Sequence, residues 1–361
     1  MTADGTDRKA GSGRHGKAAS ADPLRCPTCL ALLPRDALAV PCPGACRHDA
    51  RGPKAFGRSG LTDAGSRPLQ QAWRCPNADS GCMEVLTQVE PAGCGQPLTH
   101  PVGMPADRLR HEVLIALDRR PTTLHAGLAA LASAVCRPGA RPLHPALRPM
   151  TPETWRIWRE SRTAPGALPL PPMRNGVRPP LVFGLPARAG DWGCRLHLHG
   201  WTLDELDRKG MADRPCTAPA VERLARADGL VLLVPAADAL DREARKSLIA
   251  RVQALAAALG ECGADGSLRV CLCLLDQEVL FRRLGSGAAR PQDVAYHDPR
   301  KAAQLVALYV GRSARLEDMG EPLRRFGIAH SVVFAAVGAD GSPIGLASWS
   351  AAMRAIVGSS A

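Results

Sequence analysis

The chain has 361 residues, 45% of them hydrophobic but only 4% aromatic, and a formal net charge of +12. This length allows one large domain and a small one, with a core of Leu, Val and Ala. No apolar run approaches the roughly 20 residues needed to span a bilayer, and the polar segment 1–23 lacks the apolar core of a signal peptide. We therefore expect a cytoplasmic protein with no membrane partner and a disordered tail over 1–23.

Seven of the thirteen cysteines lie between positions 26 and 94, and we expect the region 24–98 to be a zinc ribbon. Cys26 and Cys29 form a Cys-x-x-Cys knuckle, and Cys42 and Cys46 make a second short pair. Two such pairs can complete a tetrahedral zinc site. A region rich in Gly and Pro has little apolar material with which to fold unaided, so metal would supply folding energy.

A further set of candidate ligands comprises Cys75, Cys82 and Cys94, with either His100 or His48 as the fourth. The pairs could also interleave, so that the first knuckle shares a metal with Cys75 and Cys82. All candidates are Cys or His and no coordination position is evidently open. We therefore interpret the zinc as structural.

A Gly-containing turn precedes residues 108–117, which we expect to form an amphipathic helix. A phosphate-binding loop would lie here in an open parallel sheet, and it needs glycines, a lysine and a hydroxyl residue. On that pattern Gly103 takes the first glycine, Arg108 the second, Leu109 the lysine and Arg110 the hydroxyl residue. Only Gly103 fits, although the two arginines could hold phosphate by charge.

A second helix is expected over 122–136, followed by a Pro- and Arg-rich insertion over 137–180 that contains one short helix at 153–162. Trp155 and Trp158 lie three apart on that helix and share a face. The insertion is either an exposed loop pinned by these tryptophans or a basic segment that docks a partner or nucleic acid. Its arginines are Arg137, Arg141, Arg148, Arg156, Arg159, Arg162, Arg174 and Arg178.

Buried strands alternate with helices in the rest of the chain, which indicates an α/β domain over 99–361 with a mostly parallel, three-layer sheet like that of P-loop NTPases. His197 and His199 alternate with leucines on one of these strands, which suits a strand with one wetter face; a metal site there is the less favoured alternative. The expected strands are 179–186, 194–201, 230–234, 269–276 and 330–338. The expected helices are 221–227, 238–259, 299–326 and a closing helix through Trp349 and Ile356.

This order of parts resembles the TRAFAC-class GTPase-like domains that carry an N-terminal zinc ribbon, the double-GTPase family of bacterial conflict systems. The resemblance covers about residues 24–358 and is strongest at 221–284 and 330–357. It rests on the segments ADGLVLLV, VCLCLLD and FAAVG rather than on intact motifs.

Carried over residue by residue, most of the family's nucleotide motifs fail. The Asp-x-x-Gly switch motif would run from Gly200 to Leu203, so both of its defining residues are missing. The guanine-reading motif would run from Cys273 to Asp276, and only Asp276 matches. Phosphoryl transfer depends on positioned positive charge and magnesium, so GTP and Mg²⁺ are not expected as cofactors.

The vestigial nucleotide site would therefore consist of Gly103, Arg108, Arg110 and Asp276. We expect a non-catalytic, GTPase-like scaffold or adaptor with protein partners in a bacterial multi-component system, which could serve defence. One alternative is a divergent GTP-binding NTPase. Another is a zinc-ribbon nucleic-acid-binding protein, although base-stacking aromatics are scarce in the ribbon.

Overall fold

The computed structural model describes residues 24–33, 38–39, 73–74, 85–86, 90–91, 99, 108–136, 147–163, 170–171, 178–185, 193–206, 220–264, 266, 268–285, 301, 304–305, 307–330, 332–337 and 343–344. The tail 1–23 and the closing helix through Trp349 and Ile356 lie outside these residues, so both stay predictions. Within the described part, no helix is long and apolar enough to cross a membrane.

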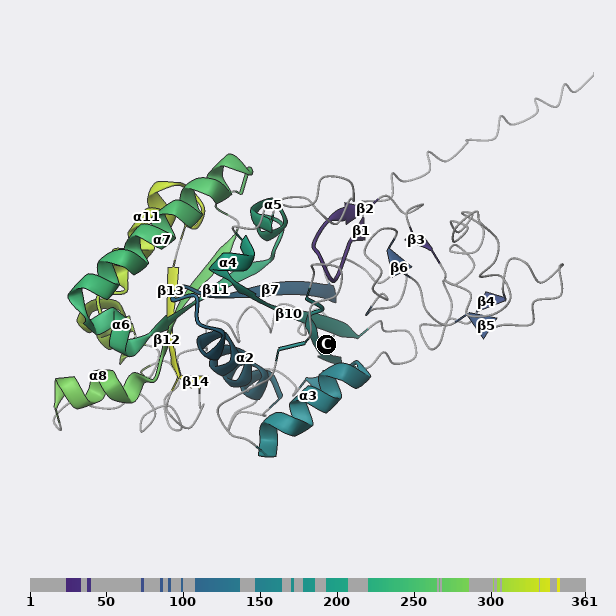
Figure 1. Cartoon of the computed structure of the whole chain (residues 1–361), viewed down its shortest axis with the longest axis horizontal. Coiled ribbons are helices and arrows are strands. Elements are labelled where there is room, and N and C mark those ends of the chain that lie inside the picture. Colours follow the sequence, from purple (N-terminus) through teal and green to yellow (C-terminus); the bar gives the residue numbers. More distant parts are fainter. Residues whose placement is uncertain are drawn as a thin grey trace, which may run out of the picture.

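A mixed, mostly parallel sheet of eight strands forms the centre of the molecule, which confirms the expected α/β class (Figure 1). Five central strands run parallel, while the outer strands β9, β8 and β14 each run antiparallel to the neighbour toward the centre. From one edge to the other the order is β14 (Pro343–Ile344), β13 (Val332–Val337), β12 (Arg269–Leu275), β11 (Gly229–Pro235), β7 (Leu109–Ala116), β10 (Cys194–Thr202), β9 (Leu181–Leu185) and β8 (Arg148–Pro149).

The strand order reverses at the centre of the sheet. After β7 the chain adds β8, β9 and β10 on one side, and then places β11, β12 and β13 on the other. Such a reversal creates a topological switch point between β7 and β11, and open α/β sheets bind ligands there, outside the carboxyl ends of the strands. The order is compatible with a P-loop-like fold.

Two apolar cores, one on each face of the sheet, make the arrangement three-layered. On one face lie α2 (Pro121–Cys136) and α3 (Pro152–Thr163), whose buried residues include Leu128 and Ile157. The opposite face is covered by helices that include α7 (Arg242–Glu261) and α11 (Glu317–Arg325) (Figure 1). Because both faces are covered, β11 and β12 are buried along almost their whole length.

The prediction of a helix over 108–117 is wrong, because Leu109–Ala116 is the central strand β7. Val113 to Leu117 form an unbroken, fully buried apolar run. Tertiary burial on both faces outweighs the helical spacing of Leu109, Val113 and Leu117. The helix begins only after this strand, at Pro121, where proline is well suited to a first turn.

Other predicted boundaries need smaller corrections. The helix expected over 238–259 is two helices, α6 (Ala236–Leu240) and α7, because Asp241 is extended and its side chain caps α7 through the Ala244 amide, 2.8 Å away. The region 299–326 holds a π-helical segment, Ala307–Ser313, before α11. Strand β10 has no wetter face, because all nine of its residues are buried.

The expected ribbon region contributes three antiparallel pairs of two-residue strands. They are β1 (Leu24–Arg25) with β2 (Leu32–Leu33), β3 (Leu38–Ala39) with β6 (Glu90–Pro91), and β4 (Trp73–Arg74) with β5 (Val85–Leu86). The first pair encloses the Cys26–Cys29 knuckle.

Candidate functional site

The loop 117–120 joins β7 to α2 at the switch point, where a phosphate-binding loop belongs in a fold of this kind. It contains neither glycine nor lysine. Its Asp118 side chain is only 3% exposed and accepts hydrogen bonds from the Arg120 amide (3.1 Å) and the Thr123 hydroxyl (2.6 Å). A carboxylate therefore occupies the start of α2.

Arginines of this loop tie it to both neighbouring strands. Arg120 Nε lies 2.6 Å from Asp118, and its guanidinium also pairs with Asp238, which follows β11. The hydrogen bond to Asp238 raises the pKa of Arg120 further. Arg119 lies 3.2 Å from Asp204 in α4 (Leu203–Leu206), the short helix that follows β10. Ion pairs thus span the carboxyl ends of three adjacent strands.

The failed switch motif, Gly200 to Leu203, spans the end of β10 and the start of α4. Glu205 in α4 is held by Arg178 (2.7 Å) and accepts from the Thr202 amide (2.9 Å). Both charged groups of this pair are mostly buried, and Arg178 also donates to the carbonyl of Gly200. The carboxylate is therefore engaged in holding the strand end.

Asp276, which the resemblance assigns to the guanine-reading motif, lies directly after β12 and before α8 (Gln277–Leu284). It is exposed and adopts the left-handed conformation, with φ of 54°. Cys273 and Leu274, which replace the polar residues of that motif, are buried. The strand end therefore offers one carboxylate rather than a nucleobase-binding set.

The structure does not bring together the residues predicted for a vestigial nucleotide site. Arg110 is at the amino end of β7, 3.6 Å from Asp228, and Arg108 immediately precedes that strand. Asp276 follows the carboxyl end of β12, which runs parallel to β7 in the same sheet. Asp276 therefore lies at the opposite end of the strands from Arg108 and Arg110. Gly103 lies outside the described residues. The loop 117–120, rather than 103–110, follows the central strand.

The Cys26–Cys29 knuckle packs against the α/β sheet. Both cysteines and Leu30 are fully buried, and Leu30 belongs to the same apolar core as β7 and β11. Arg25 forms a 3.0 Å ion pair with Asp228, whose carboxylate also accepts the amide of His111 (2.8 Å). This hairpin thus contributes Leu30 to the apolar core of the sheet, and it lies near one end of β7 in Figure 1.

Three buried histidines, His111, His197 and His199, lie on neighbouring strands β7 and β10. The rings of His111 and His197 stack at 4.6 Å, and His111 Nδ1 lies 3.4 Å from His199 Nε2. Burial is the main cause that lowers the pKa of His199 to about 3, with Arg223 and Arg25 adding to it and Cys29 opposing it. His199 is therefore neutral at physiological pH.

The metal ligands predicted from the sequence are only partly described. Cys42, Cys46, Cys75, Cys82 and Cys94 lie outside the described residues. Among the residues that are described, no three Cys, His, Asp or Glu side chains are placed to hold a metal ion. Cys26 and Cys29 thus remain candidate ligands whose partners would come from the other cysteines. Burial raises the pKa of Cys273 to about 12, so this thiol is protonated at neutral pH.

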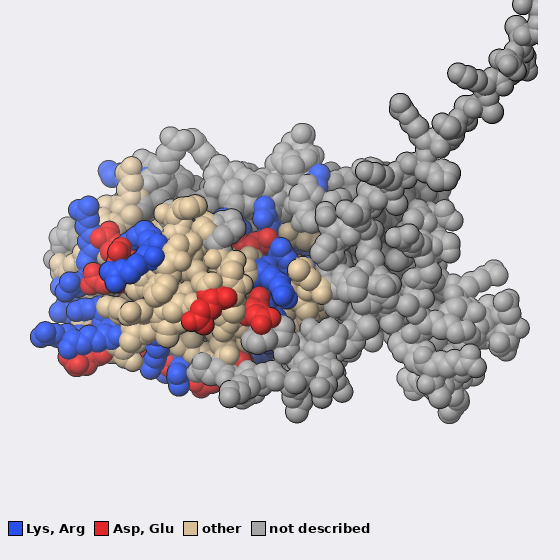
Figure 2. Space-filling view, turned by 90° about the horizontal axis from the view of Figure 1, so that it is seen from above, with Lys and Arg blue, Asp and Glu red and all other residues tan. Residues whose placement is uncertain are grey.

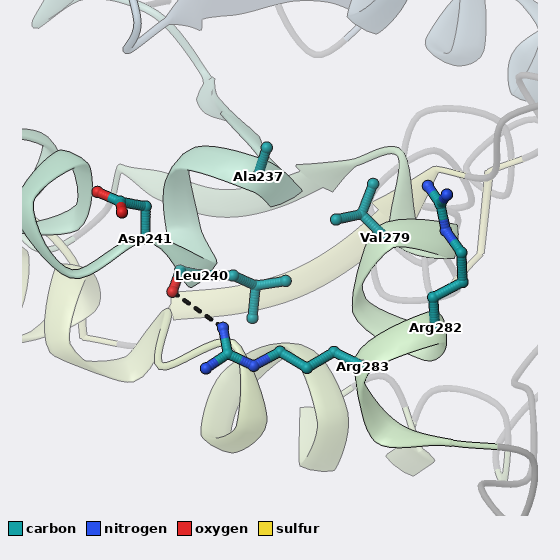
Figure 3. Close-up of a pocket in the computed structure, with 6 residues that line it drawn as sticks. All are labelled: Ala237, Leu240, Asp241, Val279, Arg282 and Arg283. Carbon is teal, nitrogen blue, oxygen red and sulfur yellow. Dashed lines mark hydrogen bonds between the residues drawn. The ribbon is translucent and has the colours of Figure 1, made fainter.

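A surface groove of about 620 Å³ lies between α6 and α8 (Figure 3). It is lined by apolar and charged residues, namely Ala237, Leu240, Val279, Asp241, Arg282 and Arg283. Arg283 donates to the carbonyl of Leu240 (3.1 Å), while the Asp241 carboxylate caps α7. Because Arg283 and Asp241 are hydrogen-bonded to backbone groups of neighbouring helices, the lining residues form no catalytic set.

The residues that close the switch point were missed by sequence reasoning. Asp118 and Arg120 fall between the two helices expected at 108–117 and 122–136, and Thr123 falls at the start of the second. The signal was present: a buried apolar run ending in Asp-Arg-Arg-Pro is typical of a strand followed by a turn and a helix start.

No known protein-family model matches this chain, and no curated protein matches it.

Proposed function

We propose that the chain is a non-catalytic, GTPase-like scaffold or adaptor that works through protein partners and has no nucleotide chemistry. The proposal is carried by the residues found at the switch point, where an α/β sheet of this order binds its ligand. The buried side chain of Asp118 lies there, and Arg120 bridges it to Asp238.

Both charge and access oppose the binding of a nucleotide phosphate at the switch point. A nucleotide phosphate arriving at α2 would meet a buried carboxylate instead of a glycine-lined cradle and a lysine. The aspartate that would read guanine stands beside buried apolar residues. Loss of each charge-assisted contact costs roughly 1.5–3 kcal/mol, so several losses would move an affinity from micromolar to millimolar or weaker.

The role in a bacterial multi-component system, which could serve defence, rests on the resemblance to the double-GTPase family. The structural zinc rests on the cysteine spacing. The knuckle's burial against the sheet argues against the nucleic-acid alternative for the face that carries Leu30, because that face is not available to a ligand.

Calorimetry on the full-length protein with GTP or ATP at about 100 μM and excess Mg²⁺ tests the proposal. We expect no binding heat, and no phosphate release above background. The matched variant is Asp276→Ala. Low-micromolar GTP binding that this variant abolishes would replace the scaffold proposal with a divergent GTPase.

A further inference from the structure

We infer that Asp118 is a built-in anion: its carboxylate occupies the position of a ligand phosphate and keeps the switch point closed without any ligand. This inference rests on the proposed function, because it explains how a GTPase-like sheet holds one conformation in the absence of nucleotide. It concerns the loop 117–120 and the first turn of α2.

The groups that hold Asp118 are the donor types that hold a phosphate. A phosphate at this position of an α/β sheet is bound by backbone amides, a hydroxyl and a cation at the start of a helix. Asp118 is held by the amide of Arg120 (3.1 Å), the hydroxyl of Thr123 (2.6 Å) and the guanidinium of Arg120 (Nε at 2.6 Å). The 16-residue helix α2 adds a favourable dipole for this negative charge.

The side chain of Asp118 is much less exposed to solvent than those of the other carboxylates at the switch point. Its side chain is 3% exposed, whereas those of Asp238 and Asp204 are 24% and 56% exposed. Asp118 is thus the inner group, shielded from competing solvent ions, and the other two are outer contacts. The outer pairs Arg120–Asp238 and Arg119–Asp204 extend the closed arrangement to the ends of β11 and β10.

The experiment compares thermal unfolding of full-length variants in inorganic phosphate and in chloride at equal ionic strength. Asp118→Ala removes the internal anion but leaves the three donors. We expect this variant to melt below wild type in chloride and to regain about 2–4 °C in tens of millimolar phosphate, because phosphate binds only its folded state. Wild type should show no such specific response.

Asp238→Ala is the matched control, since it breaks the outer pair while Asp118 still fills the site. It should lose stability without gaining a response to phosphate. Should Asp118→Ala respond no more than wild type or Asp238→Ala, Asp118 would be an ordinary helix cap and the inference would fail. The GTP experiment on wild type would be unaffected by that result, so the two failures are distinguishable.

Asp118→Asn covers the case in which the alanine variant does not fold. Asparagine keeps an acceptor for Thr123 and the Arg120 amide but removes the charge that pairs with the guanidinium. We expect it to melt below wild type and to remain insensitive to phosphate because the position is still filled. Wild-type stability for Asp118→Asn would show that the negative charge has no role, and would overturn the inference.

Discussion

Close packing at single residues determines how α2 sits on the sheet. A Cβ added to Gly127 would lie 2.3 Å from Cδ1 of Leu233, whose side chain is almost completely buried in β11. The glycine therefore sets the distance between helix and strand, because nothing larger fits at that contact.

We predict that Gly127→Ala lowers the free energy of unfolding by about 1–3 kcal/mol despite the better helix propensity of alanine. The control is Gly260→Ala in α7, where the added Cβ would meet its nearest atom at an ordinary 3.9 Å. That variant should be neutral or gain up to about 1 kcal/mol. Urea unfolding of both variants measures the contrast; equal effects at the two sites would contradict it.

The buried His199 leads to a pH prediction. Its pKa is lowered to about 3, whereas an unfolded histidine has a pKa near 6.5. Between these values the unfolded state binds the proton and the folded state does not. Above pH 6.5 the titration of His199 therefore does not reduce the free energy of unfolding. As the pH drops below 6.5, this one group lowers the free energy of unfolding by up to about 1.4 kcal/mol per pH unit.

His199→Phe should reduce the slope of stability against pH between about pH 4 and 6 relative to wild type. Chemical denaturation at several pH values gives both slopes, and the difference between them removes the contribution of the carboxylates. Parallel slopes for wild type and variant would show that His199 is accessible to protons in the native state.

At the scale of elements, the Arg-rich insertion has fewer available charges than its sequence suggests. Arg178 is paired with Glu205 in a mostly buried contact, and Arg156 is paired with Glu160 on α3. Of the two tryptophans on that helix, Trp158 packs edge-on against Phe183, whereas Trp155 is 55% exposed. Helix α3 is thus anchored through Trp158 alone of the two tryptophans that were expected to pin the insertion.

Nucleic acid should accordingly bind weakly and without sequence preference. We expect the affinity to fall steeply as salt rises, because phosphate contacts release counterions. Basic and acidic side chains are also interspersed on the face of the described part seen in Figure 2. Fluorescence anisotropy with two unrelated duplexes across a salt series provides the measurement. A nanomolar, sequence-selective complex at physiological salt would place the protein in another functional class.

At the scale of the whole molecule, the cysteine knuckle and the sheet share one core. Leu30 packs in the same core as Val113 and Leu230, and Arg25 pairs with Asp228. Metal bound at the knuckle would therefore be linked thermodynamically to the folding of the sheet.

Reduced, freshly purified protein should carry one or two zinc ions per chain, and Cys26→Ser with Cys29→Ser should remove at least one. The double variant should also lower the melting temperature of the sheet, because the knuckle is part of its core. Elemental analysis and thermal unfolding give the two readouts, with Cys262→Ser, at the end of α7, as the control. Absence of zinc from the wild-type protein would refute the metal prediction.

Much of the fold could be read from local pattern. The strands β9 to β13 and the helices α2 and α3 lie within a few residues of their expected positions, because unbroken apolar runs and proline boundaries act over short distances. The central strand β7 was predicted as a helix, because Leu109, Val113 and Leu117 fit a helical period as well as a buried strand. For an apolar run this short, packing against neighbouring strands decides between helix and strand.

The sequence by itself determined the α/β class and the lack of intact nucleotide motifs, since residue types at fixed spacings carry both. Only the tertiary structure decided which loop stands at the switch point and what fills it. Asp118 and Asp238 are far apart in the chain and meet Arg120 because β7 and β11 pair in parallel and end side by side. Arg108 and Asp276 are separated for the same reason. The direction of the strands, rather than spacing along the chain, decides whether a residue lies at the amino or the carboxyl ends of the parallel strands.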